Sequence, residues 1–356
     1  MARSPAMTSP LSSPPRRGAD PRSAVRRRRV LSRLRTFAAG LALVGLVTGC
    51  GLRLETPPVQ APIPGANEIA RQRASADSLG LAVLAAPADP ADPADPVTAL
   101  RAQVVTQAEA HLDQLGPVAS TGTGADDPAA PRPTAATSPT EAAPPATAPV
   151  DAVVARLVLA GSSARADAAS VPDGELARLL ASVSTARLLM ARQLAGAAGV
   201  EVPALPEVTA PTAVPAGPTP SALSALVAGE DEAGYGDEVI AAQLSGAART
   251  TALDRAAVHR DRGEQWARLA EIATPGLDPR RAAYALPTGL ADPAVATALA
   301  QTLELSLATS YASLLADADP DSRASLADAV TEATAAAIAW GAPVPTFPGL
   351  PERAAG

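Results

Sequence analysis

Cysteine is almost absent from this chain, because its 356 residues contain only one, Cys50. A single thiol cannot form a disulfide within the chain, so no covalent cross-link stabilises the fold. Stability must therefore come from the packing of side chains. The position of the one cysteine is informative, since it follows a short apolar run that itself follows a cluster of arginines.

Other chemically versatile residues are also scarce. The chain has two histidines, no lysine and an aromatic content of 2%. Two histidines far apart in the sequence, with no nucleophile elbow, disfavour a Ser-His-Asp site. The glycine-rich stretch at 229–236 lacks the lysine and the strand-to-helix context of a phosphate-binding loop. We therefore predict no catalytic residues.

The start of the chain is basic, whereas the rest is acidic. Of the 29 basic and 36 acidic residues, ten arginines and one aspartate lie within residues 1–49. The rest of the chain then holds 19 basic and 35 acidic groups, which is a net charge of −16. Contact with nucleic-acid phosphates requires the opposite sign, so a nucleic-acid partner is disfavoured.

Residues 1–49 have the three parts of a secretory signal peptide. Arginines fill positions 26–29, an apolar stretch runs from Phe37 to Val47, and small residues precede Cys50. The stretch is shorter than the roughly 20 residues of a membrane-spanning helix. We expect cleavage before Cys50 and its lipidation, with acyl chains such as palmitate holding the protein on the extracytoplasmic face of the cell membrane. The arginines also fit a loose twin-arginine pattern, so both that route and general secretion stay open.

Segments rich in proline, alanine and threonine divide the remaining chain. Residues 50–66 should form an extended membrane tether. Residues 67–199 should form a smaller helical lobe, interrupted at 117–149 by an insert whose length and composition predict disorder. A linker at 200–218 leads to residues 219–351. No segment has a convincing strand pattern, so the predicted fold class is all-α.

Start signals containing proline mark three helices in the last part of the chain. Thr219, Asp292 and Asp319 each precede a proline, which is typical of a capping side chain followed by the first helical residue. A fourth helix fits between residues 247 and 273. Short connections join the first helix to the second and the third to the fourth, whereas residues 274–291 could span the length of a bundle. That order is typical of ferritin-like four-helix bundles.

Two short motifs make this part of the chain distinctive. They are Ala-Ala-Tyr-Ala-Leu-Pro at 282–287 and Phe-Pro-Gly-Leu-Pro at 347–351, accompanied by Tyr235, Leu303-Glu304 and Trp340. With these residues, positions 219–351 resemble the ferritin-like domain of unknown function found in actinobacterial lipoproteins. The resemblance implies a four-helix fold, and it implies no established activity.

Four polar residues fall on the apolar stripes of the predicted bundle. Glu230 and Asp237 lie seven positions apart on the first helix, so both carboxyl groups should face the interior. His259 shares the inward face of the second helix, and Glu304 lies at the edge of the third helix's stripe. These residue types can bind a metal ion, which is one hypothesis. A ferritin-like di-iron centre uses two Glu-x-x-His pairs, however, and neither histidine has a glutamate three positions before it.

The second hypothesis is a polar network that fixes the relative positions of the helices. Buried carboxylates need partners, and Arg255, Arg260 and Arg323 lie close enough to the stripes to pair with them. His111, in the preceding lobe, is expected to be a core histidine.

Together these features favour a non-enzymatic, membrane-anchored lipoprotein that binds or supports other components of the cell envelope. We expect contacts with the membrane through lipid on Cys50 and with an unidentified protein or envelope partner. No cofactor is expected. The alternative is a metal-binding ferritin-like protein that uses Glu230, Asp237, His259 and Glu304. A solute-binding lipoprotein is disfavoured, because the alternating strands and helices of its two α/β lobes are missing from this sequence.

Overall fold

The computed structural model describes residues 63–86, 94–118 and 147–353, and in these ranges all of the regular secondary structure is helical. The predicted all-α class is confirmed. None of these helices is both long and apolar enough to span a bilayer. The predicted signal peptide, Cys50 and nearly all of the tether and the insert lie outside the described residues. The helices are α1 (Ala66–Ala85), α2 (Pro96–Leu115), α3 (Val150–Ser170), α4 (Gly174–Ala198), α5 (Pro220–Gln243), α6 (Gly246–Leu269), α7 (Pro293–Asp317) and α8 (Pro320–Ala339), followed by a 3-10 turn at Pro351–Arg353.

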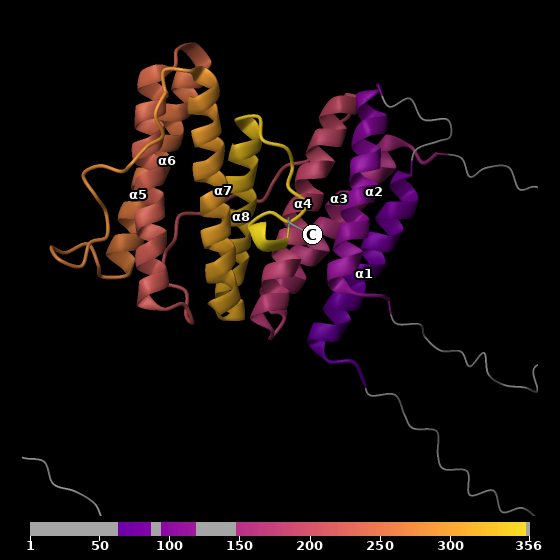
Figure 1. The fold of residues 1–356 in the computed structure, drawn as a ribbon. Helices are drawn as coiled ribbons and strands as arrows, with labels where there is room; N and C mark the ends of the chain where they lie inside the picture. The colour runs from indigo at the N-terminus through magenta and orange to yellow at the C-terminus, as the bar shows by residue number, and fades with distance from the viewer. Residues whose placement is uncertain (1–62, 87–93, 119–146, 354–356) are drawn as a thin grey trace, which may run out of the picture. The chain divides into compact units, whose positions relative to one another are not determined.

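The helices form two groups of four with the same order of pairing. In the first group α1 packs on α2, α3 on α4, and α1 on α3, while α2 also packs on α4. In the second group α5 packs on α6, α7 on α8, and α5 on α7. The groups meet where α3 and α4 pack against α7 and α8, as Figure 1 shows. The predicted four-helix bundle is therefore present, and the N-terminal lobe is a second bundle with the same connectivity.

The predicted capping residues begin two of the three helices that follow a proline signal. The side chains of Thr219 and Asp292 accept hydrogen bonds from the backbone N–H groups of α5 and α7, and proline follows each cap. Asp319 departs from the prediction, because its side chain makes no cap bond. Its backbone N–H instead donates to the carbonyl of Ala216, at 2.9 Å. This contact joins the linker to the start of α8.

Helix α1 was not predicted from the sequence. Gly65 precedes it without a side-chain cap, so the usual start signal is missing. The helix buries small residues such as Ala70 and Ala74, together with Leu81, while several of its larger apolar side chains face outward. An amphipathic pattern is therefore weak, and the helix depends on its packing against α2 and α3.

One hydrophobic core runs through both groups of helices. It includes Leu180 of α4, Leu226 of α5, Leu315 of α7 and Phe347. Phe347 belongs to residues 340–353, which follow α8 and which we call the C-terminal tail. The tail also reaches the first group, where the ring of His111 donates from Nε2 to the Thr346 carbonyl, at 2.8 Å. Residues 61–356 accordingly form one compact unit.

The linker at 200–218 is ordered and lies against the helices. Arg192 donates to the Pro203 carbonyl and Gln265 donates to the Pro211 carbonyl, both at 2.5 Å. Together with the contact between Ala216 and Asp319, these bonds hold the linker to α4, α6 and the start of α8. We call residues 208–215 the strap, because they border a cavity beside α6 and α8.

We predict that Gly349→Ala strongly destabilises residues 61–356. Gly349 has φ of +75°, and an added Cβ would lie 2.7 Å from the Ala312 Cβ and 2.9 Å from the Ala308 carbonyl oxygen. The strained backbone and the overpacking should together cost about 2 to 5 kcal/mol. Urea unfolding followed by circular dichroism measures the loss. Gly196→Ala, in α4, is the control, because nothing lies within 4 Å of its added Cβ; equal stability of the two variants would contradict the tail packing.

Candidate functional site

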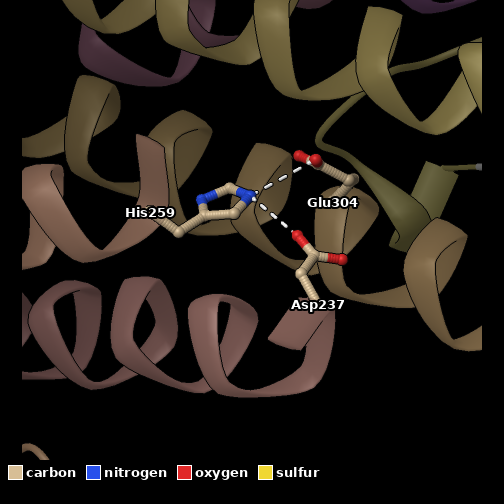
Figure 2. A group of neighbouring side chains, drawn as sticks. All are labelled: Asp237, His259 and Glu304. Carbon is tan, nitrogen blue, oxygen red and sulfur yellow. Dashed lines mark hydrogen bonds and ion pairs between the residues drawn. The ribbon is translucent and has the colours of Figure 1, made fainter. Parts of the chain in front are cut away.

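The centre of the second bundle contains a buried polar cluster. Glu230 and Asp237 enter it from α5, His259 from α6 and Glu304 from α7. Their exposed fractions are 0%, 2%, 0% and 1%, so all four residues predicted from the sequence are removed from solvent. Figure 2 shows one ring nitrogen of His259 facing both Asp237 and Glu304. The structure therefore brings together the whole predicted set.

His259 lies between carboxylates on both sides of its ring. Its Nδ1 is 2.7 Å from Oε2 of Glu230. Its Nε2 is 3.3 Å from Oε1 of Glu304 and 3.8 Å from Oδ2 of Asp237. Both ring nitrogens therefore face acceptors, which favours the imidazolium form with a proton on each nitrogen.

Arg255 pairs with Glu304 in a side-on, bidentate arrangement. Its Nε donates to Oε1 at 2.7 Å and its Nη2 donates to Oε2 at 2.9 Å, so both carboxylate oxygens of Glu304 are occupied. The same guanidinium donates through Nη1 to Glu332 of α8. Its Nη2 also lies 3.3 Å from Nε2 of His259. Arg255 thus places a fixed positive charge on the side of the cluster where Glu304 faces His259.

The carboxylate of Glu230 is occupied as fully as that of Glu304. One oxygen contacts His259, and the other accepts a hydrogen bond from the hydroxyl of Tyr311. Arg262 approaches the same carboxylate at 3.7 Å and donates to Oε2 of Glu332 at 3.1 Å. Arg255 and Arg262 of α6 therefore both contact Glu332, which links α6 to α8.

The charges in this cluster balance. Three cations, Arg255, His259 and Arg262, face three carboxylates, Glu230, Glu304 and Glu332. Burial opposes the charge on His259, but its bonds to Glu230 and Glu304 outweigh that effect and raise its pKa to about 9. Burial raises the pKa of Asp237, the remaining acid, to about 7. The cluster is electrically neutral when Asp237 is protonated.

A metal ion fits this cluster poorly. One ligand atom each from Asp237, His259 and Glu304 lie within 4.8 Å of one another, which is close enough for a single ion. However, the guanidinium of Arg255 already donates to both oxygens of Glu304. A metal also needs a neutral imidazole with a free lone pair, whereas the pKa of His259 is raised. A di-iron centre would be short of further ligands, because both oxygens of Glu230 are occupied.

A cavity of about 220 Å³ lies between the strap, α6 and α8. Arg262, Trp266 and Tyr311 line it, and the hydroxyl of Tyr311 is the group that donates to Glu230. The cavity is smaller than the roughly 300 Å³ at which drug-sized pockets begin. It could admit a small molecule to the edge of the charge network.

Of the three arginines predicted to pair with the buried acids of the network, one does so and two do not. Arg255 pairs with Glu304 as predicted. Arg260 pairs instead with Asp231 and the exposed Glu238, at the edge of the bundle. Arg323 does not pair with a carboxylate of the network, because its guanidinium donates to the carbonyls of Ala318 and Val171.

Arg262 and Glu332 were not predicted as members of the network. Arg262 lies three positions after His259, so helical spacing offered a signal that places it near the same face. The position of Glu332 in the network could not be predicted from the sequence. Its side chain is partly exposed, and it joins the cluster only through its ion pairs with Arg255 and Arg262.

Part of the chain, within the second bundle, matches a known family model. Residues 222–352 match the family model described as a domain of unknown function (DUF4439). No curated protein and no solved structure matches the chain. The matched range covers the polar cluster and most of the tail, and α1 to α4 lie outside it.

We predict that the protons held by Asp237 and His259 contribute stability that is lost as the pH rises. The pKa of Asp237 is about 7 in the folded protein against an ordinary 3.8, so between these values the native state holds a proton that the unfolded chain lacks. The Asp237 contribution to the free energy of unfolding should therefore fall with pH, by up to about 1.4 kcal/mol per unit in that window. His111, whose pKa is lowered from 6.5 to about 3, adds a contribution of opposite sign below pH 6.5. The pKa of His259 is raised from 6.5 to about 9, so its contribution is complete below 6.5 and is lost toward pH 9.

Asp237→Asn should remove the Asp237 contribution, so that between pH 4 and 7 its free energy of unfolding rises with pH relative to that of the wild type, and it should leave the contributions of His111 and His259. Urea unfolding of residues 61–356 at a series of pH values measures these contributions. Asp261→Asn, on the exposed side of α6, controls for the loss of a carboxyl group. A slope between pH 4 and 7 that stays the same in Asp237→Asn would contradict the assignment.

Proposed function

We propose that this protein is a lipoprotein anchored at the extracytoplasmic face of the cell membrane, where it acts as a non-enzymatic binding or structural module of the envelope. The order of basic region, short apolar stretch and Cys50 supports the anchor. The resemblance of its second bundle to ferritin-like domains of actinobacterial lipoproteins supports the same location.

The pairing of Arg255 with Glu304 is the observation that carries the non-enzymatic part of the proposal. A guanidinium occupies both oxygens of the carboxylate that a metal would need. Glu230 is bound by Tyr311 and His259, and Glu332 is bound by Arg255 and Arg262, rather than directed at an open site. Such an arrangement holds helices in place, and it leaves the carboxylates of Glu230, Glu304 and Glu332 without a free oxygen to act as a base. The cavity beside the strap supports a binding role for a small molecule or a partner side chain.

The alternative is a metal-binding ferritin-like protein. The close approach of Asp237, His259 and Glu304 favours it. Metal binding would require Arg255 to leave Glu304 and His259 to lose a proton, and both changes cost free energy in a buried site. We therefore rank this function second.

The anchor can be tested with Cys50→Ser in the full-length protein. We expect the variant to appear in the culture medium or to accumulate as uncleaved precursor, because serine cannot receive the lipid. Immunoblotting of membrane and medium fractions measures this. Thr48→Ala keeps a small residue before the cleavage site and serves as the control. A Cys50→Ser protein that is processed normally and stays in salt-washed membranes would refute the lipid anchor.

The role of Arg255 can be tested by thermal unfolding of residues 61–356 with and without Fe(II), Mn(II), Zn(II) or Ca(II). We expect no metal to stabilise the wild-type protein, whereas a bound metal would add about 2.7 kcal/mol at a hundredfold excess over its Kd. Arg255→Ala should lose about 3 to 5 kcal/mol, because it leaves buried carboxylates without a counter-charge.

Arg268→Ala is the matched control, since Arg268 lies on the same helix and its side chain is 66% exposed. Stabilisation of the wild-type protein by a metal, abolished in His259→Ala or Glu304→Gln, would favour the alternative function.

A further inference from the structure

The outward face of α3 has an unusual composition for a surface helix. Its exposed positions between the two ends of the helix are Ala155, Leu159, Ser162 and Ala166, and none of them is charged. The exposed face of an isolated bundle helix ordinarily carries charged or polar residues. This is the more notable because the chain after residue 49 has a net charge of −16.

Helix α1, beside α3, presents a similar outward face. Ile69, Leu79 and Val83 are 47%, 49% and 72% exposed, and Ala76 is exposed between them. Residues 69, 76 and 83 are seven positions apart, and residue 79 lies three after 76. This is the a and d spacing by which helices of a coiled coil pack together. The exposed residues of α3 follow the same alternation of three and four positions.

Two ion pairs join these helices and neutralise the charges beside the face. Arg73 of α1 pairs with Asp167 of α3 at 2.5 Å, and Asp77 of α1 pairs with Arg156 of α3 at 2.6 Å. The later residue of α1 meets the earlier residue of α3, so the helices are antiparallel. Together they form a two-helix surface without an unpaired charge along its middle.

We infer that this α1–α3 face binds a second copy of the same chain, so that two α1–α3 pairs complete a four-helix bundle between the subunits. A twofold axis parallel to the helices places α1 of one copy against α3 of the other, and each helix then has antiparallel neighbours. Antiparallel neighbours with a and d contacts are the usual arrangement in such bundles. The small exposed residues of the face, Ala76 on α1 and Ala155, Ser162 and Ala166 on α3, allow the close approach that this packing needs.

The size of the face is sufficient for a specific dimer. Helix α1 has 20 residues and is therefore about 30 Å long, and two adjacent helices are about 20 Å wide. Each copy would bury about 600 Å², or about 1,200 Å² in total, which is the lower end of the range for stable interfaces. The absence of unpaired acids along the middle removes the repulsion that two copies of an acidic protein would meet on a typical surface.

The orientation of this dimer also suits the proposed anchor, and only this step rests on the proposed function. An axis parallel to the helices puts both α1 N-termini at the same end of the dimer. Each α1 begins at Ala66, 16 positions after Cys50. Both lipids could then enter one membrane, which also raises the local concentration of the two copies.

Sedimentation velocity on residues 61–356 tests the association without involving the lipid. We expect a concentration-dependent dimer, and we expect Leu79→Glu and Leu159→Glu each to give a monomer with an unchanged helical spectrum. Leu253→Glu is the matched control, because Leu253 is 45% exposed on α6, outside the face, and the variant should still dimerise. A wild-type fragment that stays monomeric at all concentrations, or a Leu159→Glu variant that still dimerises, would overturn the inference.

Cross-linking tests the orientation. The fragment lacks Cys50 and so has no cysteine. With the axis parallel to the helices, two copies of Val83→Cys place their thiols at the same height, and a short bismaleimide should join them. Cross-linking only between Val83→Cys and Ile69→Cys would show antiparallel α1 helices and overturn the shared-membrane orientation. Failure of the dimer would leave the Cys50 fractionation result intact, so the two proposals fail separately.

Discussion

Burial of the carboxyl groups of Glu230, Asp237 and Glu304 inside one helical bundle is the constraint on which the second bundle depends. A carboxylate taken out of water loses its hydration, and this loss must be offset by nearby cations and hydrogen bonds. Arg255, His259 and Arg262, all on α6, supply the positive charge. Their partners lie on α5, α7 and α8, so every helix of the bundle contributes to one network. A shift of any helix would leave a charge unpaired, which is how the network fixes their relative positions.

The same constraint shapes what the protein can do. Guanidinium groups occupy carboxylate oxygens that a cation would need, so the counter-charge of the buried acids is built into the chain. The buried histidine of the first bundle, His111, has the opposite shift of its pKa. Burial and the charge of Arg187 lower the pKa of His111 to about 3, so it remains neutral and donates to the carbonyl of Thr346. The two histidines of the chain are thus in opposite states of charge.

Much of this structure could be predicted from the sequence, because its signals are local. The Thr219 and Asp292 caps follow from a capping side chain placed before a proline. The inward direction of Glu230 and His259 follows from helical spacing. Contacts between distant segments could not be read in this way. Asp319 binds the linker instead of capping α8, and Glu332 joins the network only because two arginines of α6 reach it. Helix α1 has no cap and a weak apolar stripe, so only its tertiary packing reveals it.

Nitrogen-15 NMR of the His259 ring tests the central claim most directly, and the second histidine, His111, provides an internal reference for the neutral form. The account predicts that at pH 7.5 both ring nitrogens of His259 carry protons, since the pKa is about 9, and that added Zn(II) or Mn(II) leaves its signals unchanged. A neutral ring at this pH, with an Nε2 signal that shifts when metal is added, would show a lone pair available for coordination. That result would contradict the arginine-balanced network and favour a metal site.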